Sequence, residues 1–194
     1  MKCDIILAGV GGQGILSIAT VIGYAAIEAG LHLKQAEVHG MSQRGGAVLS
    51  HFRISDKEIF SDLVPEGRAD MILSMEPMES LRYLPFLHAG GWVVTNSTPF
   101  INISNYPDIE AVLAEVKKCP HHLLFDADTM AKEVNNARGA NMVIAGVASV
   151  FIDIPFEKME AGVKAIFERK GENIVNKNLE ALHAGRKYAL EHKG

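Results

Sequence analysis

The chain has 194 residues, and its 48% hydrophobic and 22% charged residues are typical of one globular domain. A net charge of -4 without a basic patch argues against a nucleic-acid partner. The two cysteines, Cys3 and Cys119, cannot by themselves hold an iron–sulfur cluster or a cysteine zinc site. The eight histidines show no metal-binding spacing such as His-x-His.

Nothing in the sequence predicts a membrane segment or a secretory signal. Residues 14–30 form the most apolar long stretch, but they include Ser17, Tyr24 and Glu28, which favours a buried helix. The first residues carry one basic side chain and a short apolar run, too little for a signal peptide. We therefore expect a cytoplasmic protein without a membrane partner.

The first elements are predicted to form a βαβ unit. Residues 2–8 include a continuous apolar run, which suits a parallel strand covered on both faces. A glycine loop at 9–14 leads into a helix at 14–29, and a second strand follows at 32–39.

An antiparallel hairpin is predicted next, after a glycine-rich loop at 40–46. Residues 47–54 alternate between apolar and polar side chains, as in a strand with one buried face. A turn at 55–58 then precedes Ile59 and Phe60, which would start the return strand.

The rest of the chain alternates strands and helices. Strands are predicted at 70–74, 92–95 and 122–125, and helices at 76–87, 109–118, 126–135 and 141–151. The part from Pro155 onward repeats apolar residues at helical spacing. We predict one α/β domain over residues 1–194, Rossmann-like, with a mostly parallel sheet, an antiparallel hairpin, helices on both faces and a helical C-terminal part.

The glycine loop between the first strand and helix is the first candidate site. Gly9, Gly11, Gly12, Gln13 and Gly14 fit G-x-G-x-x-G, in the strand-to-helix context that gives this pattern meaning. Glycines let the backbone turn sharply, and the helix N-terminus favours an anion. Gln13 could add an amide donor. The pattern favours a phosphate-containing ligand over a tight turn alone.

The identity of such a ligand stays open at this point. A dinucleotide site requires an acidic residue about 20 positions after the glycines, at the end of the second strand. Glu37 occupies a suitable position, so NAD or FAD remains possible.

The loop after the second strand is the second candidate site. It contains Ser42, Gln43, Arg44 and Gly45, followed by another glycine. The planar guanidinium of Arg44 suits a phosphate or carboxylate. Because ligands in open α/β sheets bind beyond the carboxyl ends of the strands, we expect both loops to face one crevice.

These two loops carry a family resemblance. The segment GVGGQG at 9–14 and the segment HGMSQRGG at 39–46 resemble the gamma-type domain of 2-oxoacid:ferredoxin oxidoreductases, most closely those of the indolepyruvate type. The segments 141–146 and 178–185 are also similar to that family, so the resemblance covers nearly the whole chain.

The resemblance implies a subunit and not a complete enzyme. Such enzymes decarboxylate a 2-oxoacid on thiamine diphosphate, pass electrons through iron–sulfur clusters to ferredoxin and release an acyl-CoA. Thiamine diphosphate and the clusters would belong to a larger partner subunit, and this chain would contribute to assembly and to a shared coenzyme A site. The chain lacks the Gly-Asp-Gly of a thiamine diphosphate motif, in agreement with this division.

We expect no catalytic and no metal-binding residue here, and little activity from the isolated chain. Three alternatives remain open: a stand-alone NAD-binding oxidoreductase, the gamma subunit of a pyruvate or 2-oxoglutarate enzyme, and an assembly module without a small ligand.

Overall fold

The computed structural model describes residues 1–39, 45–101 and 103–193, and the side chain of residue 39 is not among the described parts. Its core is a sheet with the strand order β2-β3-β1-β4-β5-β6. The strands are β1 (Lys2–Val10), β2 (His32–His39), β3 (Ala47–Ser55), β4 (Ala69–Ser74), β5 (Leu87–Asn96) and β6 (His122–Phe125). The helices are α1 (Ile15–Glu28), α2 (Pro77–Arg82), α3 (Ile109–Lys117), α4 (Ala127–Glu133), α5 (Ala140–Ala148), α6 (Phe156–Phe167) and α7 (Glu172–His192).

The sheet is mostly parallel, as predicted. β1, β4, β5 and β6 run in one direction, whereas β3 is antiparallel to both of its neighbours, β1 and β2. The apolar run of β1 is buried on both faces, since Ile5 and Ile6 both have 0% exposure. β1 therefore lies in the middle of the sheet, and the loop that follows it opens at the sheet edge where parallel strands end.

The predicted pairing of the hairpin was wrong in one respect. β3 pairs with β2 on one side and with β1 on the other, while Ile59 and Phe60 form no strand. Because both edges of β3 are already occupied, a return strand would have no free edge to join. The βαβ unit is altered for the same reason, since β3 separates β1 from β2.

The predicted helix at 76–87 is shorter in the structure. α2 ends at Arg82, a 3-10 turn covers Leu84–Phe86, and β5 begins at Leu87 instead of residue 92. Pro85 explains the break, because proline lacks a backbone N–H and disfavours helical geometry at the preceding residue. Gly90 and Gly91 lie inside β5, where the pairing with β4 shifts register.

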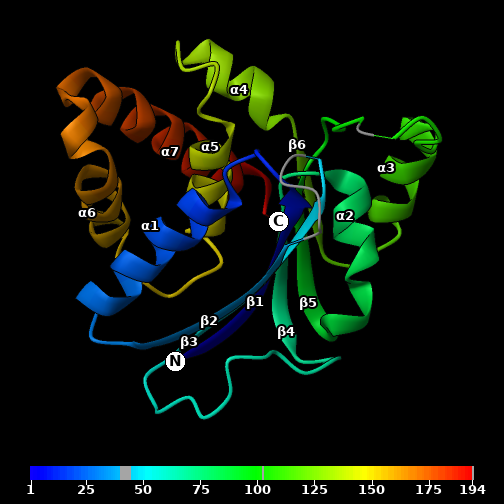
Figure 1. Ribbon diagram of the computed structural model, residues 1–194, viewed down its shortest axis with the longest axis horizontal. Helices are drawn as coiled ribbons and strands as arrows, with labels where there is room; N and C mark the ends of the chain where they lie inside the picture. Colours follow the sequence, from blue (N-terminus) through cyan, green and yellow to red (C-terminus); the bar gives the residue numbers. More distant parts are fainter. Residues whose placement is uncertain (40–44, 102, 194) are drawn as a thin grey trace.

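Helices cover both faces of the sheet (Figure 1). α1, α4, α5, α6 and α7 form a thick layer on one face, and α2 and α3 lie on the other. The main hydrophobic core lies between the sheet and the thick layer, and a smaller cluster around Ile6 and Ile72 lies on the second face. In the part of the chain that the structure describes, no helix has both the length and the apolar character needed to cross a membrane.

α5 and α7 cross at very short range through two glycines. A Cβ atom on Gly146 would lie 1.9 Å from the carbonyl oxygen of Leu182, and one on Gly185 would lie 1.9 Å from that of Val143. Only glycine permits this approach of backbones. The two late segments that carried the family resemblance therefore meet each other, and their glycines serve helix packing.

Candidate functional site

The glycine loop links the end of β1 to the start of α1 in a geometry that needs glycine. Gly12 has φ 102° and Gly14 has φ 84°, both in the region that side chains disfavour. A Cβ atom on Gly14 would also lie 2.6 Å from Nδ2 of Asn141 at the start of α5. The loop is therefore fitted closely against α5.

The side chain of Gln13 holds the loop from inside. Its Oε1 accepts a hydrogen bond from the backbone N–H of Val10 at 2.8 Å, and its Nε2 donates to the carbonyl oxygen of Met75 at 3.3 Å. The sequence suggested Gln13 as a donor to a ligand. In the structure one amide hydrogen is engaged by Met75, so Gln13 mainly ties the ends of β1 and β4 together.

The end of the second candidate loop, at Gly45 and Gly46, lies next to the first loop. The N–H of Gly11 donates to the carbonyl oxygen of Gly46 at 2.8 Å, and the N–H of Gly45 donates to that of Gly11 at 3.4 Å. The predicted ligand residues Ser42, Gln43 and Arg44 lie outside the described residues. The structure thus brings Gly45 beside the first loop, and the role of the other three remains a prediction.

The N-terminal end of α1, beside the glycine loop, has features suited to binding a phosphate. A hollow of about 320 Å³ lies against Gly11, Gly12, Gly14, Leu16 and neighbouring apolar side chains. α1 begins here, and within the described chain no side chain caps its N-terminus. In its first turn, the N–H groups of Ser17 and Ile18 donate to the carbonyl oxygen of Gly14, whereas those of Ile15 and Leu16 have no acceptor among the described residues. These N–H groups lie at the positive end of the helix dipole. A Cβ atom added to Gly12 would meet no described atom within 4 Å, so this side of the loop is open.

Glu37 is poorly placed for a dinucleotide. In a Rossmann site the acidic residue stands at the end of the strand next to β1. Here β3 occupies that place, so β2 lies two strand spacings, about 10 Å, from β1. The carboxylate of Glu37 also accepts a hydrogen bond from Gln35 on its own strand. This arrangement counts against NAD binding in the Rossmann manner.

A buried carboxylate lies at the same edge of the sheet, where β4 ends. Glu76 has 0% exposure, and its Oε2 accepts a hydrogen bond from the N–H of Glu79 at 2.8 Å, which caps α2. Its Oε1 accepts hydrogen bonds from the hydroxyl of Tyr106 and the N–H of Phe100. Burial and this hydrogen bond raise the pKa of Tyr106. Glu76 thus holds Phe100 and Tyr106, which follow β5, against the end of β4, a role that the sequence did not reveal.

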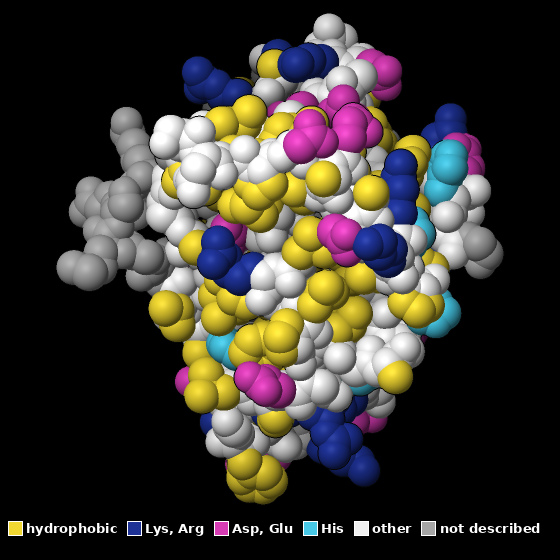
Figure 2. Space-filling model, turned by 90° about the vertical axis from the view of Figure 1, so that its right-hand side faces the viewer, with side chains coloured by type: hydrophobic (Ala, Val, Ile, Leu, Met, Phe, Trp, Pro, Cys, Tyr) yellow, Lys and Arg dark blue, Asp and Glu magenta, His cyan; other side chains and the backbone are white. Residues whose placement is uncertain are grey.

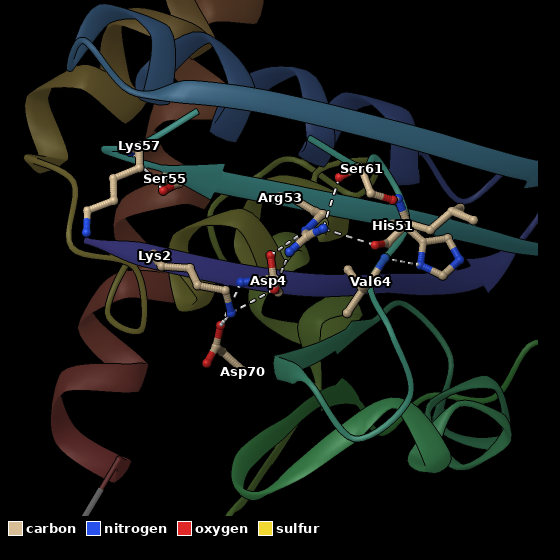
Figure 3. Close-up of polar contacts among 10 residues, drawn as sticks. Lys2, Asp4, His51, Arg53, Ser55, Lys57, Ser61, Val64 and Asp70 are labelled. Carbon is tan, nitrogen blue, oxygen red and sulfur yellow. Dashed lines mark hydrogen bonds and ion pairs between the residues drawn. The ribbon is translucent and has the colours of Figure 1, made fainter. Parts of the chain in front are cut away.

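A second buried carboxylate, that of Asp4, lies near the start of β1, whereas the glycine loop follows the end of that strand. Figure 3 shows its contacts with Arg53 and Lys2. Arg53 of β3 binds Asp4 of β1 with Nε to Oδ1 at 2.8 Å and Nη2 to Oδ2 at 3.1 Å. Nη1 of Arg53 donates to the carbonyl oxygens of Ser61 and Leu63. This group holds the segment after β3 in place and serves the fold, not the candidate site.

The two thiols are poor nucleophiles. Burial raises the pKa of Cys3 to about 12, and burial also raises the pKa of Cys119. Thiols that stay protonated near neutral pH are unsuited to attack or metal binding. Among the residues that the structure describes, no group of three or more His, Cys, Asp or Glu side chains could hold a metal ion.

Comparison with known proteins gives consistent matches. The family described as pyruvate ferredoxin/flavodoxin oxidoreductase matches residues 4–188. Indolepyruvate oxidoreductase subunit IorB of Pyrococcus horikoshii is 37% identical over 97% of this chain and 96% of its own length.

Two solved structures share the fold. The gamma subunit of keto/oxoacid ferredoxin oxidoreductase from Geobacter sulfurreducens has a TM-score of 0.71 at 24% identity, over 97% of this chain and 99% of its own. The 2-oxoglutarate:ferredoxin oxidoreductase from Magnetococcus marinus, with 2-oxoglutarate, coenzyme A and succinyl-CoA bound, has a TM-score of 0.78 at 23% identity. That match covers all of this chain and 32% of the other.

Proposed function

This chain belongs to the pyruvate ferredoxin/flavodoxin oxidoreductase family, and on that premise we propose that it is the cluster-free subunit of an indolepyruvate:ferredoxin oxidoreductase. The observation that carries the proposal is the full-length similarity to a subunit of that name, at 37% identity. The complex would oxidatively decarboxylate an aryl pyruvate to an acyl-CoA and pass the electrons to ferredoxin. Thiamine diphosphate and the iron–sulfur clusters would be held by a larger partner subunit.

The cysteine count of the chain supports this division. Two cysteines are too few to hold an iron–sulfur cluster on their own. The contribution of this chain would be assembly and part of the coenzyme A site. The name of the Magnetococcus marinus structure, with coenzyme A bound, supports a role of this kind.

The glycine loop and the loop before β3 would hold the pyrophosphate of coenzyme A. Gly11, Gly12 and Gly14 allow close approach of a phosphate, and α1 supplies uncapped N–H groups. Arg44 and its neighbours Ser42 and Gln43 would complete the site from the second loop. Coenzyme A bound there would supply the thiol that accepts the acyl group. The residues of this chain would only position it.

Exposed apolar side chains support a partner subunit. Phe60 is 86% exposed, Ile101 71%, Val38 59% and Leu63 53%. Figure 2 shows hydrophobic side chains gathered over the middle of the face on the side of α2 and α3. Large exposed apolar areas commonly mark protein interfaces.

The assembled complex provides the test of substrate and cofactor. Ferredoxin reduction would be measured with indolepyruvate, pyruvate and 2-oxoglutarate, each with and without coenzyme A. We expect kcat/KM at least about tenfold higher for indolepyruvate, because an aryl side chain contributes a large apolar contact. A preference for pyruvate or 2-oxoglutarate would assign the chain to another member of the family.

The role of the second loop has its own test. Arg44→Glu should weaken coenzyme A binding or assembly of the complex, whereas Arg68→Glu, which changes an exposed arginine before β4, should leave both unchanged. If Arg44→Glu alters neither coenzyme A affinity nor assembly, the role given to this loop is wrong.

A further inference from the structure

A second hollow lies beside the first turn of α1, and Ser17 of that turn and Asn141 of α5 are among the residues that line it. It has a volume of about 370 Å³ and lies between α1, the segment before α5, and the junction of α6 with α7. Its walls bring together three cations, Arg138, Lys170 and Lys177, and three amides, Asn136, Asn141 and Asn178. These residues come from two stretches of the chain, 136–141 and 170–178, which the fold brings together.

The charge of this pocket is uncompensated. Of the described residues that line it, none is acidic. Arg138 and the ammonium group of Lys177 take part in no ion pair with any described residue, and Lys170 lies 5.2 Å from the centre of the Phe167 ring. Several like charges facing one hollow attract a multivalent anion from solution.

Hydrogen bonds join the chain segments that carry Arg138 and Lys177. Nδ2 of Asn136 donates to the carbonyl oxygen of Lys177 at 3.1 Å and to Oδ1 of Asn178 at 3.3 Å, which ties the segment carrying Arg138 to α7. Nδ2 of Asn178 donates to the carbonyl oxygen of Ile174 at 2.8 Å. The amides thus serve mainly as scaffold, and the three cations remain to meet a ligand.

The pocket is also coupled to the glycine loop. Nδ2 of Asn141 donates to the carbonyl oxygen of Gly14 at 3.4 Å, so the wall of the pocket touches the loop directly. Ser17, in the first turn of α1, lines the pocket, while Leu16 lines the hollow at the loop. A long ligand could therefore place one group at the glycine loop and a second anionic group in the pocket.

We infer that the pocket formed by Arg138, Lys170 and Lys177 binds the terminal phosphate of a nucleotide whose pyrophosphate lies at the glycine loop. Under the proposed function, on which this inference rests, the nucleotide is coenzyme A and the terminal phosphate is its 3′-phosphate. The pocket then determines specificity, because 3′-dephospho-CoA and NAD lack this phosphate. A phosphate group surrounded by several cationic side chains can accept a charge-assisted hydrogen bond from each of them, and such bonds are stronger than those between neutral groups.

The test compares two ligands on the purified complex. Arg138→Gln combined with Lys177→Gln should weaken coenzyme A binding by at least tenfold and change 3′-dephospho-CoA binding by less than twofold. Lys187→Gln, on the same helix but outside the pocket, should change neither affinity. Unchanged coenzyme A affinity in the double variant, or an equal loss for both ligands, would overturn the inference.

A separate probe distinguishes failure of the inference from failure of the proposed function. If the wild-type complex binds no coenzyme A, the coenzyme A role is wrong, and adenosine 3′,5′-bisphosphate then tests the pocket alone. Binding of this probe that the double variant loses would support a phosphate site. No binding of the probe, or binding that the double variant retains, would overturn it.

Discussion

Oε1 of Gln13 accepts a hydrogen bond from the buried N–H of Val10 at 2.8 Å, so a side chain of the glycine loop bonds to the backbone of the same loop. Nε2 of the same residue donates to the carbonyl oxygen of Met75 at the end of β4. The loop is therefore shaped before any ligand arrives, which lowers the cost of ordering it on binding.

Two substitutions of Gln13 distinguish its contact with Val10 from its contact with Met75. Gln13→Ala leaves the N–H of Val10 without its acceptor and should lower the free energy of unfolding by about 1–3 kcal/mol. Gln13→Glu keeps an acceptor and should cost less, but its charge should weaken binding of an anionic ligand. Urea unfolding and coenzyme A titration of the complex measure the two effects. Equal destabilisation by both variants would contradict this account of the loop.

Gly14 should be more sensitive than a glycine with similar backbone geometry elsewhere. Gly14→Ala forces a positive φ on alanine and brings Cβ to 2.6 Å from Nδ2 of Asn141, so we expect a loss of about 2–4 kcal/mol. Gly30→Ala also has a positive φ, but its Cβ meets no described atom within 4 Å, and about 1–2 kcal/mol is expected. Chemical unfolding of both variants gives the comparison. Equal losses of stability in the two variants would show that the side chain of Asn141 moves away from the new Cβ atom at little cost.

The crossing of α5 and α7 should not tolerate a methyl group. Gly146→Ala and Gly185→Ala each place Cβ 1.9 Å from a backbone carbonyl oxygen and should cost about 3 kcal/mol or more. Gly23→Ala, within α1, meets only side-chain atoms, Cδ2 of Leu33 at 3.0 Å and the ring of Phe52 at 3.7 Å, and should change stability by less than about 1 kcal/mol. The melting temperatures of the three variants, compared with that of the wild-type protein, test this prediction. A mild effect at Gly146 would mean that the helices can separate at little cost.

The ion pair between Arg53 and Asp4 should matter far more than an exposed pair. Arg53→Met removes the two-pronged partner of the Asp4 carboxylate, which is 2% exposed and then keeps only Lys2, with Nζ 2.7 Å from Oδ2; the loss should be about 1.5–3 kcal/mol. Lys118→Met removes the exposed partner of Glu115 and should cost less than about 1 kcal/mol. Denaturant unfolding at neutral pH compares the two variants, and similar small losses would show that water replaces Arg53.

His51 should make stability depend on pH. Burial lowers its pKa below the ordinary value, and its Nδ1 accepts a hydrogen bond from the N–H of Val64 at 3.2 Å. The folded state thus favours the neutral ring, so His51 stabilises the fold above pH about 6.5 and this contribution is lost as pH falls further. His51→Gln should flatten the fall in unfolding free energy between pH 7 and pH 5. His192→Gln, at an exposed position, should not.

Much of the architecture followed from the sequence, because continuous apolar runs and glycine punctuation are local signals. The strand at β1, the glycine loop and the helical tail needed no knowledge of neighbours. The position of β3 in the sheet could not be predicted from its own residues. The alternation of apolar and polar side chains is the same whether a strand pairs with β1, with β2 or with a later segment. Pro85 is a local signal for the break after α2, because proline disfavours continuation of a helix.

The site was predictable only in part, for a similar reason. G-x-G-x-x-G is a contiguous pattern, and the contact between Gly11 and Gly46 agrees with the expected meeting of the two loops. The engagement of Gln13 with Met75 was hidden, since it joins two strands. The cationic pocket was hidden as well, because Arg138 belongs to one stretch of the chain and Lys170 and Lys177 to another.

The most direct test of the proposed function is the purification of the tagged chain from its native host, with the mass and the visible spectrum of what accompanies it. The account predicts a brown complex with a larger second chain, the broad absorption of iron–sulfur clusters and bound thiamine diphosphate. A colourless chain that purifies without a partner would contradict it.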